Sequence, residues 1–333
     1  MNWHIYRGEG PPHDDITRLP PPPPWRAFHA ADAVTAPPVP EPDEDRARAQ
    51  RYVPDEETVE LVNAALYLRR PLLVTGNPGE GKSTLAYAIA HELGLGKVLT
   101  WPITSRATLR DGLYRYDPLS RLYVSSLAER QKTLEPEDPG AFIRLGPLGT
   151  ALLPHERPRV LLVDEVDKSD IDLPNDLLTV FEEGRYEIPE LVRLASDNQT
   201  VSVLTHDGYD RVPINGGRVR CRDFPLVVMT SNSEREFPAA FLRRCVQVVL
   251  KPPNAERLRA IVAAHLADLV DSSTDLIEVF LSHRSEGQLA TDQLLNAIFL
   301  TNHAARVGAV DRQALANKLM RHLSAIPPQA DAG

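Results

Sequence analysis

The sequence predicts an α/β fold in which a five-stranded parallel sheet is followed by a smaller, all-helical domain. Two observations carry this prediction. Short apolar runs of strand length alternate with helix-like segments, which is typical of a doubly wound parallel sheet. After Pro252-Pro253 the apolar spacing becomes helical throughout. The five predicted strands span residues 71–75, 97–101, 159–164, 226–230 and 246–250.

Two of these strands are predicted to lie in the middle of the sheet. Residues 160–163 and 226–229 are apolar at every position. A strand that is apolar on both sides needs helices on both faces of its sheet. Helix-like segments at 83–93 and 174–183 separate the strands and supply that cover.

The N-terminal segment differs in composition from the rest. Five consecutive prolines run from Pro20 to Pro24, and proline favours extended polyproline II structure over helix or sheet. We predict a flexible arm here, and the alternative is a docking peptide anchored by Trp25 and Phe28. The predicted parts are the arm at 1–53, the α/β core at 54–251, the helical domain at 252–324 and a loose tail at 325–333.

A hairpin insert is predicted at about 185–223 within the core. Asn215-Gly216 lies between strand-like runs, which is a strong signal for a hairpin turn. Arg218, Arg220 and Arg222 alternate and therefore share one strand face. We interpret them either as contacts for nucleic acid or an acidic partner, or as charges that protect an edge strand.

Composition limits the classes of function. The 333-residue chain has a formal net charge of −9, which argues against a protein that coats nucleic acid non-specifically. Cys221 and Cys245 are the two cysteines, too few for a disulfide framework. No run of about 18 apolar residues is present, so we expect no membrane span. The N-terminus lacks an apolar signal core, and we expect a cytoplasmic protein.

The sequence from Gly76 to Ser83 matches the Walker A pattern for phosphate binding. It follows a predicted strand and opens a predicted helix, so backbone amides and the helix N-terminus would surround the phosphates. We expect Lys82 to reach the β- and γ-phosphates of ATP and the Ser83 hydroxyl to bind Mg²⁺. The predicted nucleotide-binding residues here are Gly76, Asn77, Pro78, Gly79, Glu80, Gly81, Lys82, Ser83 and Thr84.

A second pattern lies at the end of the strand at 159–164. Its apolar run ends in Asp164-Glu165, a Walker B pattern. The open-sheet rule places these acids beside the phosphate-binding loop. We expect Asp164 to hold Mg²⁺ and Glu165 to act as the base that polarises the attacking water.

Two further polar residues follow predicted strand positions. Asn232 comes directly after the strand at 226–230 and is predicted to orient the same water. Arg244 precedes the last strand, where an arginine is placed to reach the γ-phosphate of a neighbouring subunit. With Lys82 and Glu165, these residues complete the predicted catalytic set.

Together these motifs resemble the AAA+ ATPases, and within them the MoxR-like group. The resemblance covers roughly residues 54–323 and rests on 76–83, 160–169, 229–234 and 237–245, while 110–117 is similar to an insert that these proteins carry after the second strand. It implies a P-loop NTPase core with a C-terminal α-helical lid, and a ring, usually of six subunits, with ATP between them. It implies Asn232 as sensor 1 and Arg244 as the arginine finger, with Arg243 as runner-up. One departure is that no basic residue lies between Arg284 and Arg306, where the family usually supplies a second sensor, so either Arg284 substitutes or the sensor is absent.

The resemblance implies a partner-protein remodeller or chaperone, with a von Willebrand factor A-domain protein as the expected class of partner. Two alternatives remain. One is a nucleotide-operated switch or scaffold with slow turnover, suggested by the missing lid cation. The other is the ATPase subunit of a nucleic-acid-directed defence or restriction complex, which the acidic net charge disfavours.

Overall fold

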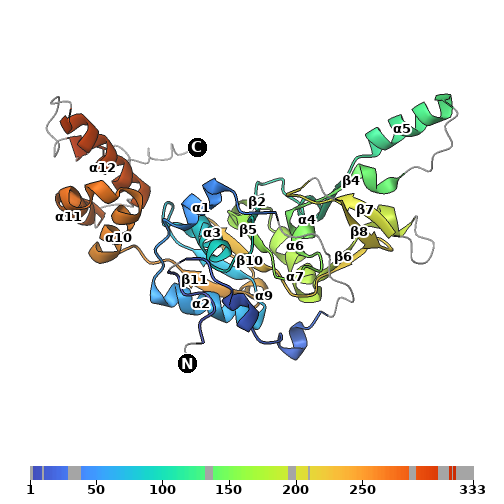
Figure 1. The fold of residues 1–333 in the computed structure, drawn as a ribbon, viewed down its shortest axis with the longest axis horizontal. Coiled ribbons are helices and arrows are strands. Elements are labelled where there is room, and N and C mark those ends of the chain that lie inside the picture. Colours follow the sequence, from blue (N-terminus) through green and yellow to red (C-terminus); the bar gives the residue numbers. More distant parts are fainter. Residues whose placement is uncertain are drawn as a thin grey trace, which may run out of the picture.

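The structure, a computed structural model of the chain, centres on one parallel sheet, with helices gathered beyond one end and a single helix projecting at the other (Figure 1). The described residues are 3–9, 11–28, 39–131, 138–193, 200–208, 211–284, 290–306, 315–316 and 318–319.

The central sheet has the five predicted strands, all parallel, in the order β11-β1-β10-β5-β2, so the predicted P-loop NTPase fold is confirmed. Strands β10 and β5 lie inside the sheet, as their continuous apolar runs predict. The strands are β1 (Leu72–Thr75), β2 (Leu99–Pro102), β5 (Val160–Asp164), β10 (Leu226–Ser231) and β11 (Val246–Val249).

Alternate side chains of the three inner strands, β1, β5 and β10, enter two separate cores. Leu72 and Val74 of β1 pack in one core with α2 and α3, whereas Leu73 packs in the other with α6 and α7. This follows from the two-residue period of a strand, because successive side chains point to opposite faces. The covering helices are α1 (Asp43–Ala49), α2 (Glu56–Leu68), α3 (Lys82–Glu92), α6 (Pro147–Ala151), α7 (Leu173–Glu183) and α9 (Ala239–Leu242).

The chain leaves the central sheet after β2 and builds a second, four-stranded sheet in the order β3-β4-β7-β8. Helix α5 (Pro118–Gln131) connects β3 to β4 and projects away from the core (Figure 1). The other elements here are α4 (Leu109–Leu113), β3 (Tyr114–Tyr116), η3 (Pro139–Phe142), β4 (Ile143–Leu145), η4 (Val166–Lys168), β6 (Arg185–Glu187), α8 (Pro189–Val192), β7 (Thr200–Leu204), β8 (Arg211–Asn215) and β9 (Arg218–Arg220).

The insert at 185–223 contains a hairpin, but Asn215-Gly216 does not form its turn. The antiparallel hairpin pairs β7 with β8, and residues 205–210 connect them. Asn215-Gly216 instead redirects the chain from β8 to β9, which pairs with β6 in a separate two-stranded sheet. Gly216 has a φ of 57°, so the predicted turn is present at this position. The prediction was wrong in the strand that pairs after the turn. Arg218, Arg220 and Arg222 are exposed, as their alternation predicts.

Three helices follow the core and share their own apolar cluster, which includes Leu258, Phe280 and Leu294. They are α10 (Ala255–His265), α11 (Thr274–Arg284) and α12 (Thr291–Arg306), with the short turns η5 (Ala267–Leu269) and η6 (Asp271–Ser273) between the first two. Figure 1 shows them together beyond one end of the central sheet. Most of the predicted fourth helix, and the predicted tail at 325–333, lie outside the described residues.

The N-terminal segment corrects the prediction of a flexible arm wherever it is described. Ile5 and Tyr6 are 1% exposed, and their amides donate to Asn63 Oδ1 at 2.6 and 3.0 Å. Short 3₁₀ turns η1 (Asp15–Arg18) and η2 (Pro24–Arg26) follow along the same segment. Proline content alone predicted a flexible arm. The segment is nevertheless packed on the core, because core side chains form hydrogen bonds with its backbone groups.

Arg26 anchors the end of this segment. Its guanidinium donates to the carbonyls of Arg69 at 2.6 Å and Phe181 at 2.8 Å, and it lies 4.6 Å from the centre of the Phe224 ring. Phe28 packs on Phe224 as well, so it serves the chain's own core and not an external docking site. Of the helices that the structure describes, none is both long enough and apolar enough to cross a membrane.

Candidate nucleotide-binding site

The predicted phosphate-binding loop connects the end of β1 to the start of α3. Gly79 and Gly81 have φ values of 77° and 83°, a backbone region that L-residues with a Cβ rarely adopt. Gly81 is the N-cap of α3, so the first free amides of an 11-residue helix face the loop. The local geometry is therefore that of an anion site at a helix N-terminus.

Lys82 is folded back into the loop. Its side-chain ammonium donates to the carbonyl oxygens of Gly76 and Asn77, both at 2.8 Å, and the residue is 8% exposed. Burial lowers the pKa of Lys82, and the nearby carboxylates, first Glu80 and then Asp167, act in the opposite direction. The lysine is thus held over the loop by backbone oxygens.

Glu80 occupies part of the loop. Its Oε2 accepts from the Asn77 backbone N–H at 2.9 Å, and its Oε1 accepts from the Asn77 side chain at 3.0 Å. A carboxylate here engages an amide of the kind that would face a phosphate. A phosphate that binds the Asn77 amide must therefore displace the Glu80 carboxylate from it.

A chain of hydrogen bonds joins three elements at the carboxyl edge of the sheet. Ser83 Oγ of α3 donates to Asp164 Oδ1 at 2.6 Å, and Thr230 Oγ1 of β10 donates to the same oxygen at 2.7 Å. Thr230 Oγ1 in turn accepts from the Glu165 backbone N–H at 2.8 Å. The structure therefore brings the Walker A serine and both Walker B acids together, as the sequence predicts.

Asp167 connects the Walker B turn to the segment after β10. Its Oδ2 accepts from the backbone N–H groups of Asn232 at 2.8 Å and Glu234 at 3.1 Å. Asp167 is 3% exposed, and its Oδ1 has no hydrogen-bond partner among the described residues. The position of Asn232 beside Walker B thus depends on a buried carboxylate.

Glu165 has an unusual backbone conformation, with φ 60° and ψ 50°. A left-handed conformation at a residue that is not glycine costs free energy, and such residues cluster at functional sites. Its carboxylate accepts from Lys168 Nζ at 2.7 Å, and both side chains are 42% exposed. The predicted base is therefore reachable by solvent.

The first residues of α12 approach the loop from the lid. A Cβ added to Gly79 would lie 2.7 Å from Asp292 Oδ1 and 2.8 Å from the Ala290 Cβ, so only glycine permits this contact. At this point of contact the lid therefore presents an acid, Asp292, to the phosphate-binding loop. The side chain of Arg284, the alternative second sensor, lies outside what is described.

A cavity of about 160 Å³ lies between the core, the lid and the N-terminal segment. Tyr52, Gly81 and Arg257 contribute to its walls, together with Thr84, Ile261 and Asp292. Its position next to the phosphate-binding loop suits the base and sugar of a nucleotide.

The two candidate finger residues differ in their contacts. Arg244 Nε donates to Glu182 Oε1 of α7 at 2.6 Å, so it is engaged within its own chain. Arg243 is exposed, and its side chain makes no hydrogen bond or ion pair with the described residues. Neither side chain contacts the phosphate-binding loop in the described part of the chain.

The residues of this site fit Mg-ATP. Mg²⁺ prefers oxygen ligands and is usually held by one or two protein groups together with phosphates and water. Ser83 Oγ and Asp164 Oδ1, 2.6 Å apart, offer such oxygens next to the loop.

Sequence reasoning missed Thr230 and Asp167, which organise the predicted residues. Thr230 and Ser231 are the two polar residues at the end of an otherwise apolar buried strand, and that break in the apolar pattern was the available signal. Asp167 had no such signal, because an acid after Walker B reads as a solvated turn residue.

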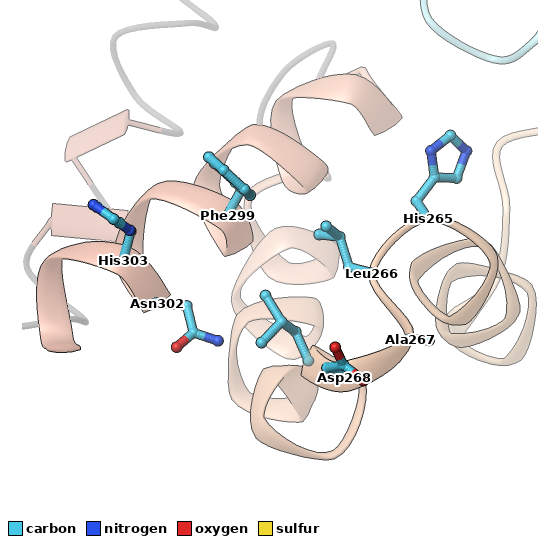
Figure 2. A pocket seen from close by; sticks show the side chains of 8 residues that line it. His265, Leu266, Ala267, Asp268, Phe299, Asn302 and His303 are labelled. Atoms are coloured by element: carbon cyan, nitrogen blue, oxygen red, sulfur yellow. The ribbon is translucent and has the colours of Figure 1, made fainter. Parts of the chain in front are cut away.

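A further cavity of about 310 Å³ lies within the lid, between the end of α10 and α12 (Figure 2). Phe299, Asn302 and His303 of α12 line one side of it, and Leu266 and Asp268 line the other. None of the predicted site residues lines this cavity.

A family match agrees with this geometry. A search of curated proteins finds no match. Among solved structures, the chain is similar to the structure of C. elegans PCH-2, with 14% sequence identity, coverage of 85% of this chain and 68% of that chain, and a TM-score of 0.38. Residues 71–245 match the family described as AAA domain (dynein-related subfamily), a match that runs from the start of β1 past α9. The chain belongs to this AAA domain family, and nucleotide binding is the property that the family and the loop geometry share.

Proposed function

We propose that the chain is a Mg-ATP hydrolase of the MoxR-like type that acts as an oligomer to remodel or activate a partner protein. The observation that carries the proposal is the hydrogen-bond chain from Ser83 through Asp164 and Thr230 to Glu165. This chain supports the proposal because it holds two oxygens suited to Mg²⁺, and the backbone of the proposed base Glu165, at one edge of the sheet beside a loop suited to phosphates.

Each residue has a distinct role in this proposal. Lys82 would neutralise charge on the β- and γ-phosphates, and Ser83 and Asp164 would hold Mg²⁺. Glu165 would accept a proton from the attacking water, with Asn232 orienting that water. Bound Mg²⁺ supplies charge neutralisation across the phosphates.

An oligomer, by resemblance a six-membered ring, would add an arginine from the neighbouring subunit. We retain Arg244 as the proposed finger and Arg243 as runner-up. The Glu182 contact means that Arg244 must exchange its partner to act in trans, whereas Arg243 needs no such exchange. Substituting each in turn, and measuring ATP hydrolysis, separates the two.

The assignment to the MoxR-like group is supported by the insertion of α4, β3, α5 and β4 between strands β2 and β5. The resemblance implies a partner protein, with a von Willebrand factor A-domain protein as the expected class. Stimulation of ATP hydrolysis by such a partner would test this part of the proposal.

The central experiment compares the wild type with Glu165→Gln. Loss of a general base lowers hydrolysis by about 10²- to 10⁴-fold, while nucleotide binding at Lys82 and Ser83 is retained. Phosphate release and ATP affinity are measured side by side, and the assembled mass is measured with and without Mg-ATP.

Glu183→Gln is the matched control. Glu183 is an exposed glutamate that forms an ion pair, as Glu165 does, but it lies at the end of α7 and not in the Walker B motif. The control is expected to hydrolyse ATP at the wild-type rate. Equal hydrolysis by Glu165→Gln and the wild type would refute the role given to Glu165. A monomer at every nucleotide concentration would contradict an arginine acting in trans.

A second candidate function is a nucleotide-operated switch with slow turnover. The observation that favours it is Asp292, an acid where the lid meets the phosphate-binding loop. A carboxylate there does not stabilise the charge that develops on the γ-phosphate. Tight ATP binding with negligible hydrolysis by the wild-type oligomer would select this function over the first.

A further inference from the structure

A cavity of about 650 Å³ opens between the carboxyl end of β2 and the second sheet. Its lining comes from three segments that the fold brings together: the end of β2 and the loop after it, strands β3 and β4, and the loop between β7 and β8. The phosphate-binding loop and the Walker B acids do not line it. It is therefore a separate site.

Three arginines give this cavity its chemistry. Arg106, Arg115 and Arg144 all line it, and none forms an ion pair with a carboxylate of the described residues. Asp111 is the one acid among its lining residues, all of which are described; it is the acidic residue of the α4 capping box, and its hydrogen bonds from Thr108, helped by the nearby Arg115, lower its pKa. Its Oδ2 accepts from the Thr108 backbone N–H at 3.0 Å and from the Thr108 hydroxyl at 2.7 Å. The cavity thus has an excess of positive charge.

The arrangement of two of these arginines is unfavourable for the fold itself. Arg115 of β3 lies directly opposite Arg144 of β4 in the antiparallel register. Like charges directly opposite one another destabilise a strand pair. Arg144 is fixed by donating to the carbonyls of Thr205 at 3.1 Å and His206 at 3.3 Å, which hold its guanidinium without neutralising it.

We propose that this cavity binds an acidic, extended segment of a polypeptide. Arginine forms its strongest hydrogen bonds with carboxylates, often in pairs. Alternate side chains of an extended peptide lie on one side about 7 Å apart, so alternating acidic residues can meet successive arginines. Trp101, Leu145 and Pro147 add apolar wall for the intervening side chains.

The lining favours a peptide over single-stranded nucleic acid. Binding of unpaired bases relies on exposed aromatic rings for stacking. Trp101 is the cavity's one residue of the Phe, Tyr or Trp type, and it is 5% exposed because it packs against Gly112.

The end of β2 connects this cavity to the nucleotide site, because it pairs with the end of β5. Pro102, in its wall, lies opposite Asp164 in the parallel register of β2 and β5. The next amide, that of Ile103, donates to the Asp164 carbonyl at 2.9 Å. A peptide that displaces the end of β2 would therefore reach the magnesium-binding acid through one residue pair.

This inference rests on the proposed function only in assigning the peptide to a partner protein. Peptide binding is measured without hydrolysis, so the two can fail separately. Binding without ATP hydrolysis would leave the inference standing and end the proposed function. ATP hydrolysis without peptide binding would leave the proposed function standing and end the inference.

The test uses the full chain and a fluorescent peptide of about twelve residues, long enough to span the cavity, with alternating Glu and Ala. The same peptide with Gln in place of Glu is the control ligand. We expect anisotropy to show binding of the first and not the second, weakening strongly between low salt and about 0.3 M salt. Arg115→Gln should weaken binding about tenfold, because it removes charge-assisted hydrogen bonds, and Arg115→Lys should recover most of it.

Arg220→Gln is the matched control, since Arg220 is an exposed strand arginine outside this cavity. It should leave peptide affinity unchanged, whereas Arg106→Gln, a second and independent cavity variant, should weaken binding as Arg115→Gln does. Equal affinity for the Glu and Gln peptides would overturn the proposal. So would unchanged affinity in both Arg106→Gln and Arg115→Gln. Tighter, Arg115-dependent binding of a single-stranded oligonucleotide would overturn it in favour of a nucleic-acid site.

Discussion

The charged groups around the phosphate-binding loop and those in the arginine cavity are arranged in opposite ways. At the loop, Lys82 is held by two carbonyls, Asp164 accepts from two hydroxyls and Glu165 pairs with Lys168. In the cavity, Arg115 and Arg144 face each other without a carboxylate between them. The groups of the first site are bonded to one another, whereas the second site carries an excess of positive charge, because Asp111 is the one acid beside its three arginines.

This difference indicates which of the two sites gains stability from a charged ligand. A site whose groups are mutually bonded can keep its geometry before a ligand arrives, which is what catalysis requires. A site with one sign of charge gains most when an opposite charge enters it. The experiments below test whether charged side chains with a bonded partner stabilise the fold or the site, and whether a cavity arginine without a carboxylate partner lowers the free energy of unfolding.

The largest effect is expected from breaking the buried ion pair behind the cavity. Arg159 and Asp207 lie 2.6 Å apart, and both side chains are 3% exposed. Asp207→Ala leaves a buried guanidinium unpaired, so the free energy of unfolding should fall by about 3 to 5 kcal/mol. Denaturant unfolding measures the change.

Glu187→Ala is the control, because Glu187 pairs with Arg218 at an exposed site, and its loss should cost less than about 1 kcal/mol. Equal losses in the two variants would break the comparison. Burial alone would raise the pKa of Asp207, but Arg159 outweighs it and holds that pKa below its ordinary value. The stabilisation is therefore complete above the unfolded pKa of about 3.9 and is lost as the pH falls through the lower, folded pKa.

An intermediate effect is expected at Asp167. Asp167→Ala removes the acceptor for the amides of Asn232 and Glu234, so the segment after β10 should shift. A displaced catalytic group of this kind lowers kcat by about tenfold to a hundredfold, with a smaller change in KM. Steady-state ATP hydrolysis measures both.

Asp167→Asn keeps one acceptor oxygen and should recover most of the lost kcat, which a general loss of packing would not allow. If the alanine and asparagine variants are equally slow, the negative charge and not the hydrogen bonds accounts for the effect. An unchanged kcat in both would remove Asp167 from the positioning role.

The smallest effect is the change in stability caused by Arg115→Gln. Removing one of two like charges directly opposite one another should raise the free energy of unfolding by about 0.2 to 1 kcal/mol. Thermal unfolding at low salt measures it, and the gain should shrink in high salt because the repulsion is screened. A loss of stability would show that Arg115 is already compensated and would weaken the comparison.

The sequence predicts the central sheet well because its signals are local. Continuous apolar runs identify β5 and β10 as inner strands, and glycines at 79 and 81 fit the positive φ values found there. The pairing of β9 with β6 was not predictable from Asn215-Gly216, because a turn signal defines a change of direction and not the strand that lies next to the chain.

The candidate site was predicted in its parts but not in its connections. Ser83, Asp164 and Glu165 lie together as expected, since parallel strands end at one edge. The contact of Asp292 with Gly79 depends on how the lid docks, which no local pattern encodes. Thr230 and Asp167 act through hydrogen bonds between segments more than 60 residues apart.

The N-terminal segment has a consequence for where this protein can be shortened. Asn63 is fully buried inside α2, and its side-chain amide bonds to Tyr6, while Glu92 at the end of α3 accepts from the amides of Arg7 and Gly8. A version beginning at Pro54 would leave the Glu92 carboxylate and part of the Asn63 amide in an apolar surface with fewer partners. Such a truncation would expose apolar surface that the N-terminal segment covers and would favour aggregation, so recombinant versions of this protein should keep residues 3–9.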